Sequence, residues 1–232
     1  MVSLWQIDLT VVKFDLERQD RGMTVTPKAH GRHHHVDLRR ALLDAVAEIV
    51  LEQGPEAVTL RECARRAGVS HSAAAPHFGD KRGLLTAFAI ERSERLTRAM
   101  RDAAAALSQD AAPLARLAAT GRGYIAFARD NPAHFRLMFR TDLIDTTNET
   151  WRTSARATFA PLSEAMAAVA PGADARAMRA RLSLAWAAVH GFCSLRAEGA
   201  GGDLWNPEPR AAEVAEDLLA LLVGACATPP RP

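Results

Sequence analysis

The sequence places three consecutive polar residues where a short helix is expected to begin: Ser70, His71 and Ser72. Ala64 and Gly68 precede them at a spacing of four. A small residue lets two helices cross closely, and a glycine takes the turn between them without a Cβ clash, so this spacing is typical of a helix-turn-helix. The hydroxyl and imidazole groups would then lie at the N-terminal end of a second helix, from Ser70 to Phe78, where side chains can reach base edges in a DNA major groove.

A basic segment approaches this motif from the N-terminal side. From Lys28 to Arg40 the chain carries four lysines or arginines and four histidines against the single acid Asp37. The net charge of the whole chain is only +2, but phosphate binding responds to local charge rather than to the total. We therefore count Arg39 among the candidate DNA contacts.

The helices that must position these residues are indicated by their caps. A first helix is expected from Leu38 to Gln53, with Asp37 as its N-cap and Gly54 as its end. The run Thr59-Leu60-Arg61-Glu62 is typical of a capping box, and it predicts a short helix that Gly68 ends. Together these helices would form the frame of the helix-turn-helix.

The remainder of the chain is also expected to be helical. Ser70 can cap the helix that reaches Phe78, and Asp80 can cap a long helix from Lys81 to about Ala106. Further helices are expected over residues 112–130, 134–139, 148–170, 173–196 and 208–226. Alanine is abundant and tyrosine occurs once, so the predicted fold class is all-α. We expect a disordered or irregular N-terminal tail (1–31), a three-helix DNA-binding domain (32–82) and a helical ligand-binding and dimerisation bundle (83–232).

The segment from Leu38 to Phe88 resembles the DNA-binding domain of the TetR family of transcriptional regulators. Three motifs carry the resemblance: Thr59-Leu60-Arg61-Glu62, Gly68-Val69-Ser70 and His77-Phe78-Gly79-Asp80-Lys81. The resemblance implies that four residues face DNA phosphates: Thr59, Ser70, His77 and Lys81. The lead-in from His33 to Arg39 is also similar to that of many members.

Two positions of the expected recognition helix depart from the family pattern. Ala75 stands where members usually carry a tyrosine, which removes one phosphate contact. Pro76 follows it, and a proline inside a helix lacks the backbone N–H and destabilises the helix by about 3 kcal/mol. The sequence therefore predicts a short or kinked recognition helix and a weaker operator affinity rather than a different fold.

The C-terminal part contains two aromatic stretches, residues 124–139 and the run Trp186-Ala187-Ala188-Val189-His190-Gly191. Both resemble a C-terminal domain named WHG after its Trp, His and Gly, found in a subset of TetR-type regulators. This resemblance implies a helical domain that binds a ligand and forms dimers. Packing of four segments would also join large apolar surfaces with a few polar tips, as in small-molecule pockets. The candidate ligand-binding residues are Tyr124, Met138, Phe159, Trp186 and His190.

Dimer formation is expected through the last two long helices, 173–196 and 208–226, whose alanine-rich faces allow close packing across a two-fold axis. A two-fold dimer predicts a palindromic operator. The predicted function is that of a cytoplasmic TetR-type regulator, a homodimer that binds double-stranded operator DNA and responds to a small, largely apolar effector. We favour a repressor that the effector releases, and activation stays open.

Other kinds of chemistry have little support in the sequence. It contains no nucleophile elbow, zinc-protease motif, P-loop or Rossmann glycine pattern, so we expect neither an enzyme nor a cofactor. His190 and Cys193 lie three apart but lack a third metal ligand, and the three cysteines show no disulfide framework. No apolar run is long enough to span a membrane. The alternative is a helical enzyme, or a ligand-binding or oligomerisation protein, that does not bind DNA.

Overall fold

The computed structural model describes residues 32–200 and 210–228, with side chains from Leu38 onward in the first helix. These residues form nine α-helices and one short 3-10 turn, and they contain no strand, so the predicted all-α fold class is confirmed. The expected tail, 1–31, lies outside the described residues. The elements are α1 (Arg32–Gln53), η2 (Pro55–Ala57), α2 (Leu60–Arg66), α3 (His71–Phe78), α4 (Lys81–Ala105), α5 (Pro113–Asp130), α6 (Pro132–Met138), α7 (Glu149–Val169), α8 (Ala175–Ala197) and α9 (Arg210–Ala227).

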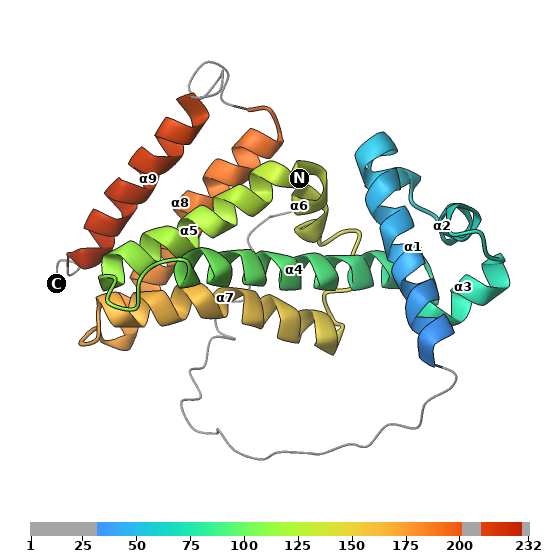
Figure 1. The fold of residues 1–232 in the computed structure, drawn as a ribbon, viewed down its shortest axis with the longest axis horizontal. Coiled ribbons are helices and arrows are strands. Elements are labelled where there is room, and N and C mark those ends of the chain that lie inside the picture. Colours follow the sequence, from blue (N-terminus) through green and yellow to red (C-terminus); the bar gives the residue numbers. More distant parts are fainter. Residues whose placement is uncertain (1–31, 201–209, 229–232) are drawn as a thin grey trace, which may run out of the picture.

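The helices form two groups that α4 joins (Figure 1). The first group contains α1, α2 and α3, and the second contains α5, α7, α8 and α9. The early turns of α4 bury Leu84 and Phe88 in the core of the first group, and its later turns bury Leu96 and Met100 in the core of the second. A movement of α4 therefore affects both groups. None of the helices in the described residues is long and apolar enough to cross a bilayer.

Three side chains cap α2, α3 and α4 as the sequence predicts. Thr59 Oγ1, Ser70 Oγ and Asp80 Oδ1 each accept the backbone N–H three residues further on, at 3.1, 3.2 and 2.8 Å. These bonds satisfy N–H groups that have no partner within the helix. The carboxylate of Glu62, the other half of the predicted capping box, instead binds the guanidinium groups of Arg65 and Arg66.

The predicted cap of the first helix is wrong. α1 begins at Arg32, and Asp37, the expected N-cap, lies inside the helix. No glycine or proline interrupts residues 32–37, so nothing in the backbone ends the helix there. α6 also begins earlier than expected, at Pro132 rather than His134, because proline is well accepted at the first helical position. The remaining boundaries agree with the predicted ones within two residues.

A buried arginine holds the end of α9 against α8. Arg181 donates from Nε to Cys226 O at 2.9 Å and from Nη2 to Thr228 O at 3.2 Å. The last carbonyl groups of a helix have no intrahelical donor, and a cation beside them is favoured by the helix dipole. Arg181 therefore stabilises the position of α9 in the bundle.

Candidate functional site

The corner between α2 and α3 has the geometry of a helix-turn-helix. The N–H of Val69 donates to Ala64 O at 2.9 Å and closes the turn. Gly68 lies in this turn with φ of 68°, a left-handed conformation that favours glycine. Ala64 and Ala74 are fully buried in the core of the first group. The corner that the residue spacing predicts is therefore present.

α3 carries its polar residues on the surface. Ser70, His71 and Ser72 are exposed at its N-terminal end, and His77 is half-buried in its last turn. Pro76 lies inside the helix, which continues past it although the proline cannot donate to the carbonyl of Ser72. The helix is eight residues long, as the prediction of a short recognition helix requires.

Thr59 and Lys81, which the resemblance also assigns to DNA phosphates, lie outside α3, and both have hydrogen-bond partners. Lys81 Nζ donates to Glu56 O at 2.7 Å. Thr59 Oγ1 accepts the capping bond from the N–H of Glu62, and this bond does not use its own O–H donor. The guanidinium carbon of Arg39 lies 5.6 Å from the ring centre of Phe78, at the end of α3. The Lys81 ammonium has three N–H donors, so two of them remain for a DNA phosphate while the third binds Glu56 O.

One further cation lies beside this surface. Arg61 is exposed near the start of α2, next to Thr59, and has no hydrogen bond or ion pair within the described residues. The sequence interpretation named only Thr59 from the run 59–62 and omitted this arginine. Its place two residues after Thr59, to which the family resemblance assigns a phosphate contact, was the signal that could have singled it out.

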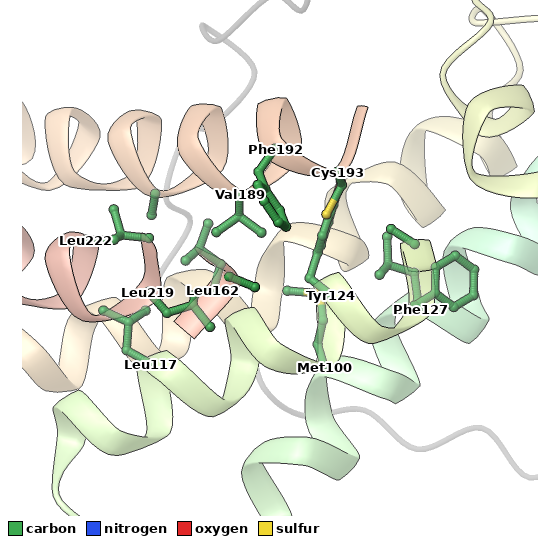
Figure 2. Close-up of a cluster of buried hydrophobic side chains, with 14 of the residues drawn as sticks. Met100, Leu117, Tyr124, Phe127, Leu162, Val189, Phe192, Cys193, Leu219 and Leu222 are labelled. Atoms are coloured by element: carbon green, nitrogen blue, oxygen red, sulfur yellow. The ribbon is translucent and has the colours of Figure 1, made fainter. Parts of the chain in front are cut away.

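A small cavity of about 30 Å³ lies in the core of the second group, between α4, α5, α7, α8 and α9. Figure 2 shows apolar side chains from these helices converging there. Three of the predicted ligand-binding residues line it, namely Tyr124, Trp186 and His190. Met138 and Phe159 do not: Met138 is packed in the core, and the ring of Phe159 lies 4.3 Å from that of Trp186 between centres.

The sequence interpretation missed most of the cavity lining. Several lining residues are ordinary leucines, such as Leu117 and Leu219, whose type and helical spacing are those of packed core. Gly121 was a better signal. A Cβ built on it would lie 2.5 Å from Leu219 Cδ2, so a larger residue here would have to displace the Leu219 side chain.

A chain of hydrogen bonds runs along one wall of the cavity. The Tyr124 hydroxyl lies 2.8 Å from His190 Nδ1, and His190 Nε2 lies 3.3 Å from Ser194 Oγ. Burial lowers the pKa of His190 to about 4 and raises the pKa of Tyr124, so both groups are neutral at pH 7. The cavity lining therefore carries no charge.

The arrangement around His190 differs from that of a metal site. Both of its ring nitrogens lie within hydrogen-bonding distance of hydroxyl groups. Burial raises the pKa of the Cys193 thiol to about 12, so the thiol keeps its proton at neutral pH. Within residues 32–200 and 210–228, no three His, Cys, Asp or Glu side chains gather as metal ligands would.

Comparison with known proteins bears on both groups of helices. The family described as "Bacterial regulatory proteins, tetR family" matches residues 42–88, and the one described as "Tetracyclin repressor-like, C-terminal domain" matches residues 117–224. The chain belongs to the TetR family. This TetR-family protein is accordingly a transcriptional regulator with a DNA-binding domain and not an enzyme.

Individual relatives cover this TetR-family chain to different extents. It is 41% identical over 92 residues to the HTH-type transcriptional regulator BetI of Rhizobium meliloti, a match that covers 40% of the chain and 43% of BetI. The chain thus spans less than half the length of that curated relative. A solved protein of unknown function from Rhodococcus sp. RHA1 is 25% identical, with a TM-score of 0.67 over 85% of this chain and 97% of that one. FadR from Bacillus subtilis, solved in complex with stearoyl-CoA, shares the fold at 14% identity, with a TM-score of 0.61 over 79% of this chain and 97% of FadR.

Proposed function

We propose that this TetR-family regulator is a homodimeric repressor that binds a palindromic operator through α3 and leaves it when a small, uncharged, largely apolar molecule enters the cavity. The observation that carries the proposal is the course of α4. This helix begins at Lys81, beside α3, and contributes Met100 to the cavity lining. In this proposal residues 32–82 form the DNA-binding domain, and residues 83–232 bind the effector and form the dimer.

The proposed effector is uncharged because the cavity offers no counter-charge. An ionised carboxylate or ammonium would be buried there beside a neutral His190, at a large desolvation cost. FadR, a protein of the same fold, was solved with stearoyl-CoA, whose stearoyl chain is apolar although its CoA part is charged. The volume of about 30 Å³ is far below the roughly 300–1,000 Å³ of ordinary ligand pockets. A ligand must therefore push the cavity walls apart, which would displace the helices.

The proposed DNA contacts divide into two kinds. Base edges are read from the exposed N-terminal end of α3, where His71 and Ser72 project from the surface. Phosphates are contacted by residues around that helix, which carry no base information themselves. The proposed phosphate contacts are Arg39, Thr59, Ser70, His77 and Lys81, to which the exposed Arg61 is added.

Lys81→Ala is expected to weaken binding to all DNA sequences alike. A phosphate contact responds to charge only, so the slope of log Kd against log salt concentration should fall by about 1 for any duplex. His71→Ala is the contrasting variant, because it should relax discrimination at one base position and leave the salt slope unchanged. Fluorescence anisotropy titrations at several salt concentrations measure both effects. An unchanged slope for Lys81→Ala would mean that Lys81 does not contact a DNA phosphate.

Gly121→Trp is expected to imitate the effector by filling the cavity. Its side chain would press on Leu219, and we expect operator affinity to fall about tenfold while the protein stays folded and dimeric. Gly172→Trp is the matched control, because a Cβ at Gly172 meets no atom within 4 Å. Operator binding is measured by anisotropy and folding by circular dichroism. If folded Gly121→Trp bound DNA with parental affinity, the effector site would have to lie elsewhere.

The proposed dimer interface consists of the outer faces of α8 and α9. Of the five exposed large hydrophobic residues in the described part of the chain, three lie on these two helices, namely Leu184, Leu195 and Leu221. Exposed apolar residues gathered on one surface are typical of protein–protein interfaces. The two helices also lie side by side at the end of the bundle (Figure 1), so their outer faces can pair across one two-fold axis.

A further inference from the structure

Two buried nitrogens without a hydrogen-bond partner lie where the two groups of helices meet. Arg92 Nε on α4 and His134 Nδ1 on α6 find no partner among the described residues. Both side chains contact the ring of Phe88: the Arg92 guanidinium carbon lies 4.6 Å from its centre, and the His134 ring centre lies 5.3 Å away. Because Arg92 donates hydrogen bonds and a neutral imidazole can accept one, the two unpaired groups are complementary.

His134 also ties α6 to the first group of helices. Its Nε2 lies 3.1 Å from Ala47 O on α1, so the proton of the imidazole is assigned to Nε2 and Nδ1 is the acceptor. Burial lowers the pKa of His134, and the nearby Arg92 and Arg95 lower it further, which keeps the ring neutral. α6 therefore contacts the DNA-binding domain through a neutral, directional hydrogen bond.

The next residue of α6 contacts the cavity wall. The ring centre of Phe135 lies 5.7 Å from that of Tyr124 and 5.6 Å from that of His190, and both of these residues line the cavity. α6 is only seven residues long, and His134 and Phe135 are adjacent on it. A ligand that displaces Phe135 must therefore also move His134.

We propose that His134 couples the cavity to the DNA-binding domain through a junction that has two arrangements. The proposal rests on the proposed function, in which the cavity holds the effector. In the arrangement described here, His134 holds α1 through Ala47 O and Arg92 Nε stays unpaired. In the second, α6 has shifted, Arg92 Nε donates to His134 Nδ1, and the bond to Ala47 O is lost. The first arrangement is disfavoured by the unpaired Arg92 Nε and His134 Nδ1, and the second by the loss of the bond to Ala47 O. A ligand that binds one arrangement more tightly therefore shifts the population toward it.

The test is a double-mutant cycle between Gly121→Trp, which fills the cavity, and substitutions at His134. The measured quantity is Kd for the duplex that the parent protein selects from a random library, and the parent should show an increase of about tenfold on Gly121→Trp. His134→Phe keeps a ring but no donor, and the increase should fall below about twofold in that background. His134→Gln should restore it, because its amide N–H can still donate to Ala47 O.

Arg92→Met supplies a second variant in case His134→Phe does not fold. It keeps the bond between His134 and Ala47 but removes the donor that the second arrangement requires, so the effect of Gly121→Trp should again fall below about twofold. Arg95→Met is the matched control: both arginines pair with Glu91, but only Arg92 has a buried nitrogen without a partner, so Arg95→Met should leave the tenfold effect intact. Thermal unfolding shows whether a variant is merely less stable, which by itself would not change the ratio of affinities.

The outcomes separate this coupling from the proposed function. If Gly121→Trp changes Kd equally in the parent, His134→Phe and Arg92→Met backgrounds, the role of His134 is overturned while the effector cavity stands. If Gly121→Trp has no effect in the folded parent, the effector cavity fails and the coupling fails with it. A loss of the effect in His134→Phe and Arg92→Met, together with its return in His134→Gln, supports the two arrangements.

Discussion

Gly83→Ala is expected to abolish sequence-specific DNA binding while the C-terminal bundle stays folded. Gly83 lies in the first turn of α4, and a Cβ built on it would lie 2.1 Å from Phe78 O, the carbonyl oxygen of the last residue of α3. Such an approach is impossible, so α3 must move away from α4, at a cost of about 1–3 kcal/mol for overpacking. The recognition helix would then miss its base contacts, and we expect operator affinity to fall at least about 100-fold toward the nonspecific level.

The matched control for Gly83→Ala is Gly172→Ala, since a Cβ at Gly172 has open space around it. Anisotropy titrations with the selected duplex and with a scrambled duplex measure specific and nonspecific binding separately. Far-UV circular dichroism shows whether the helices persist. Parental affinity for the selected duplex in Gly83→Ala would mean that the contact between α3 and α4 does not position the recognition helix.

Leu221→Arg is expected to convert the dimer into a monomer and to weaken operator binding by about 100-fold or more. Leu221 on α9 is 76% exposed, more than the other large hydrophobic residues of the described chain. In the proposed interface it is buried against the partner subunit, where an arginine would place two like charges near the two-fold axis. Two DNA-binding domains that are no longer linked lose the advantage of binding both half-sites together. This advantage commonly amounts to about 10²–10⁴ in affinity.

Leu51→Arg is the matched control for this substitution. Leu51 on α1 is 60% exposed but lies in the DNA-binding domain, away from α8 and α9. Sedimentation velocity gives the oligomeric state of each variant, and anisotropy gives its operator affinity. A dimeric Leu221→Arg variant, or a monomeric Leu51→Arg variant, would place the interface on a different surface.

Features that depend on neighbouring residues could be predicted from the sequence. The caps at Thr59, Ser70 and Asp80 follow from the ability of a side-chain oxygen to accept an N–H three residues later, whatever the surrounding fold. Asp37 could cap a helix in the same way, but α1 already begins at Arg32. No glycine or proline lies between Arg32 and Asp37 to end the helix there. A side-chain cap can therefore be predicted only where a residue that breaks a helix, such as glycine or proline, stands shortly before it.

The cavity depends on how helices pack, which the sequence shows only in part. Tyr124 and His190 were identifiable because polar tips on an apolar helix are unusual. Phe159 has the same apolar character as the true lining, yet the rotation of α7 places it against Trp186 instead. Ser194 joins the hydrogen-bond chain only because it lies one turn after His190 on α8. Rotation of helices about their axes is set by tertiary packing and not by periodicity alone.

The most direct test of the account is a selection of bound duplexes from a random DNA library by the full-length protein. The predicted result is a two-fold symmetric sequence, bound by two protomers, in which each half-site is read by one α3 helix. Mass measurement of the complex gives the number of protomers, and competition with scrambled DNA gives the specificity. Failure to enrich any sequence, or equal affinity for selected and scrambled duplexes, would contradict operator recognition through α3.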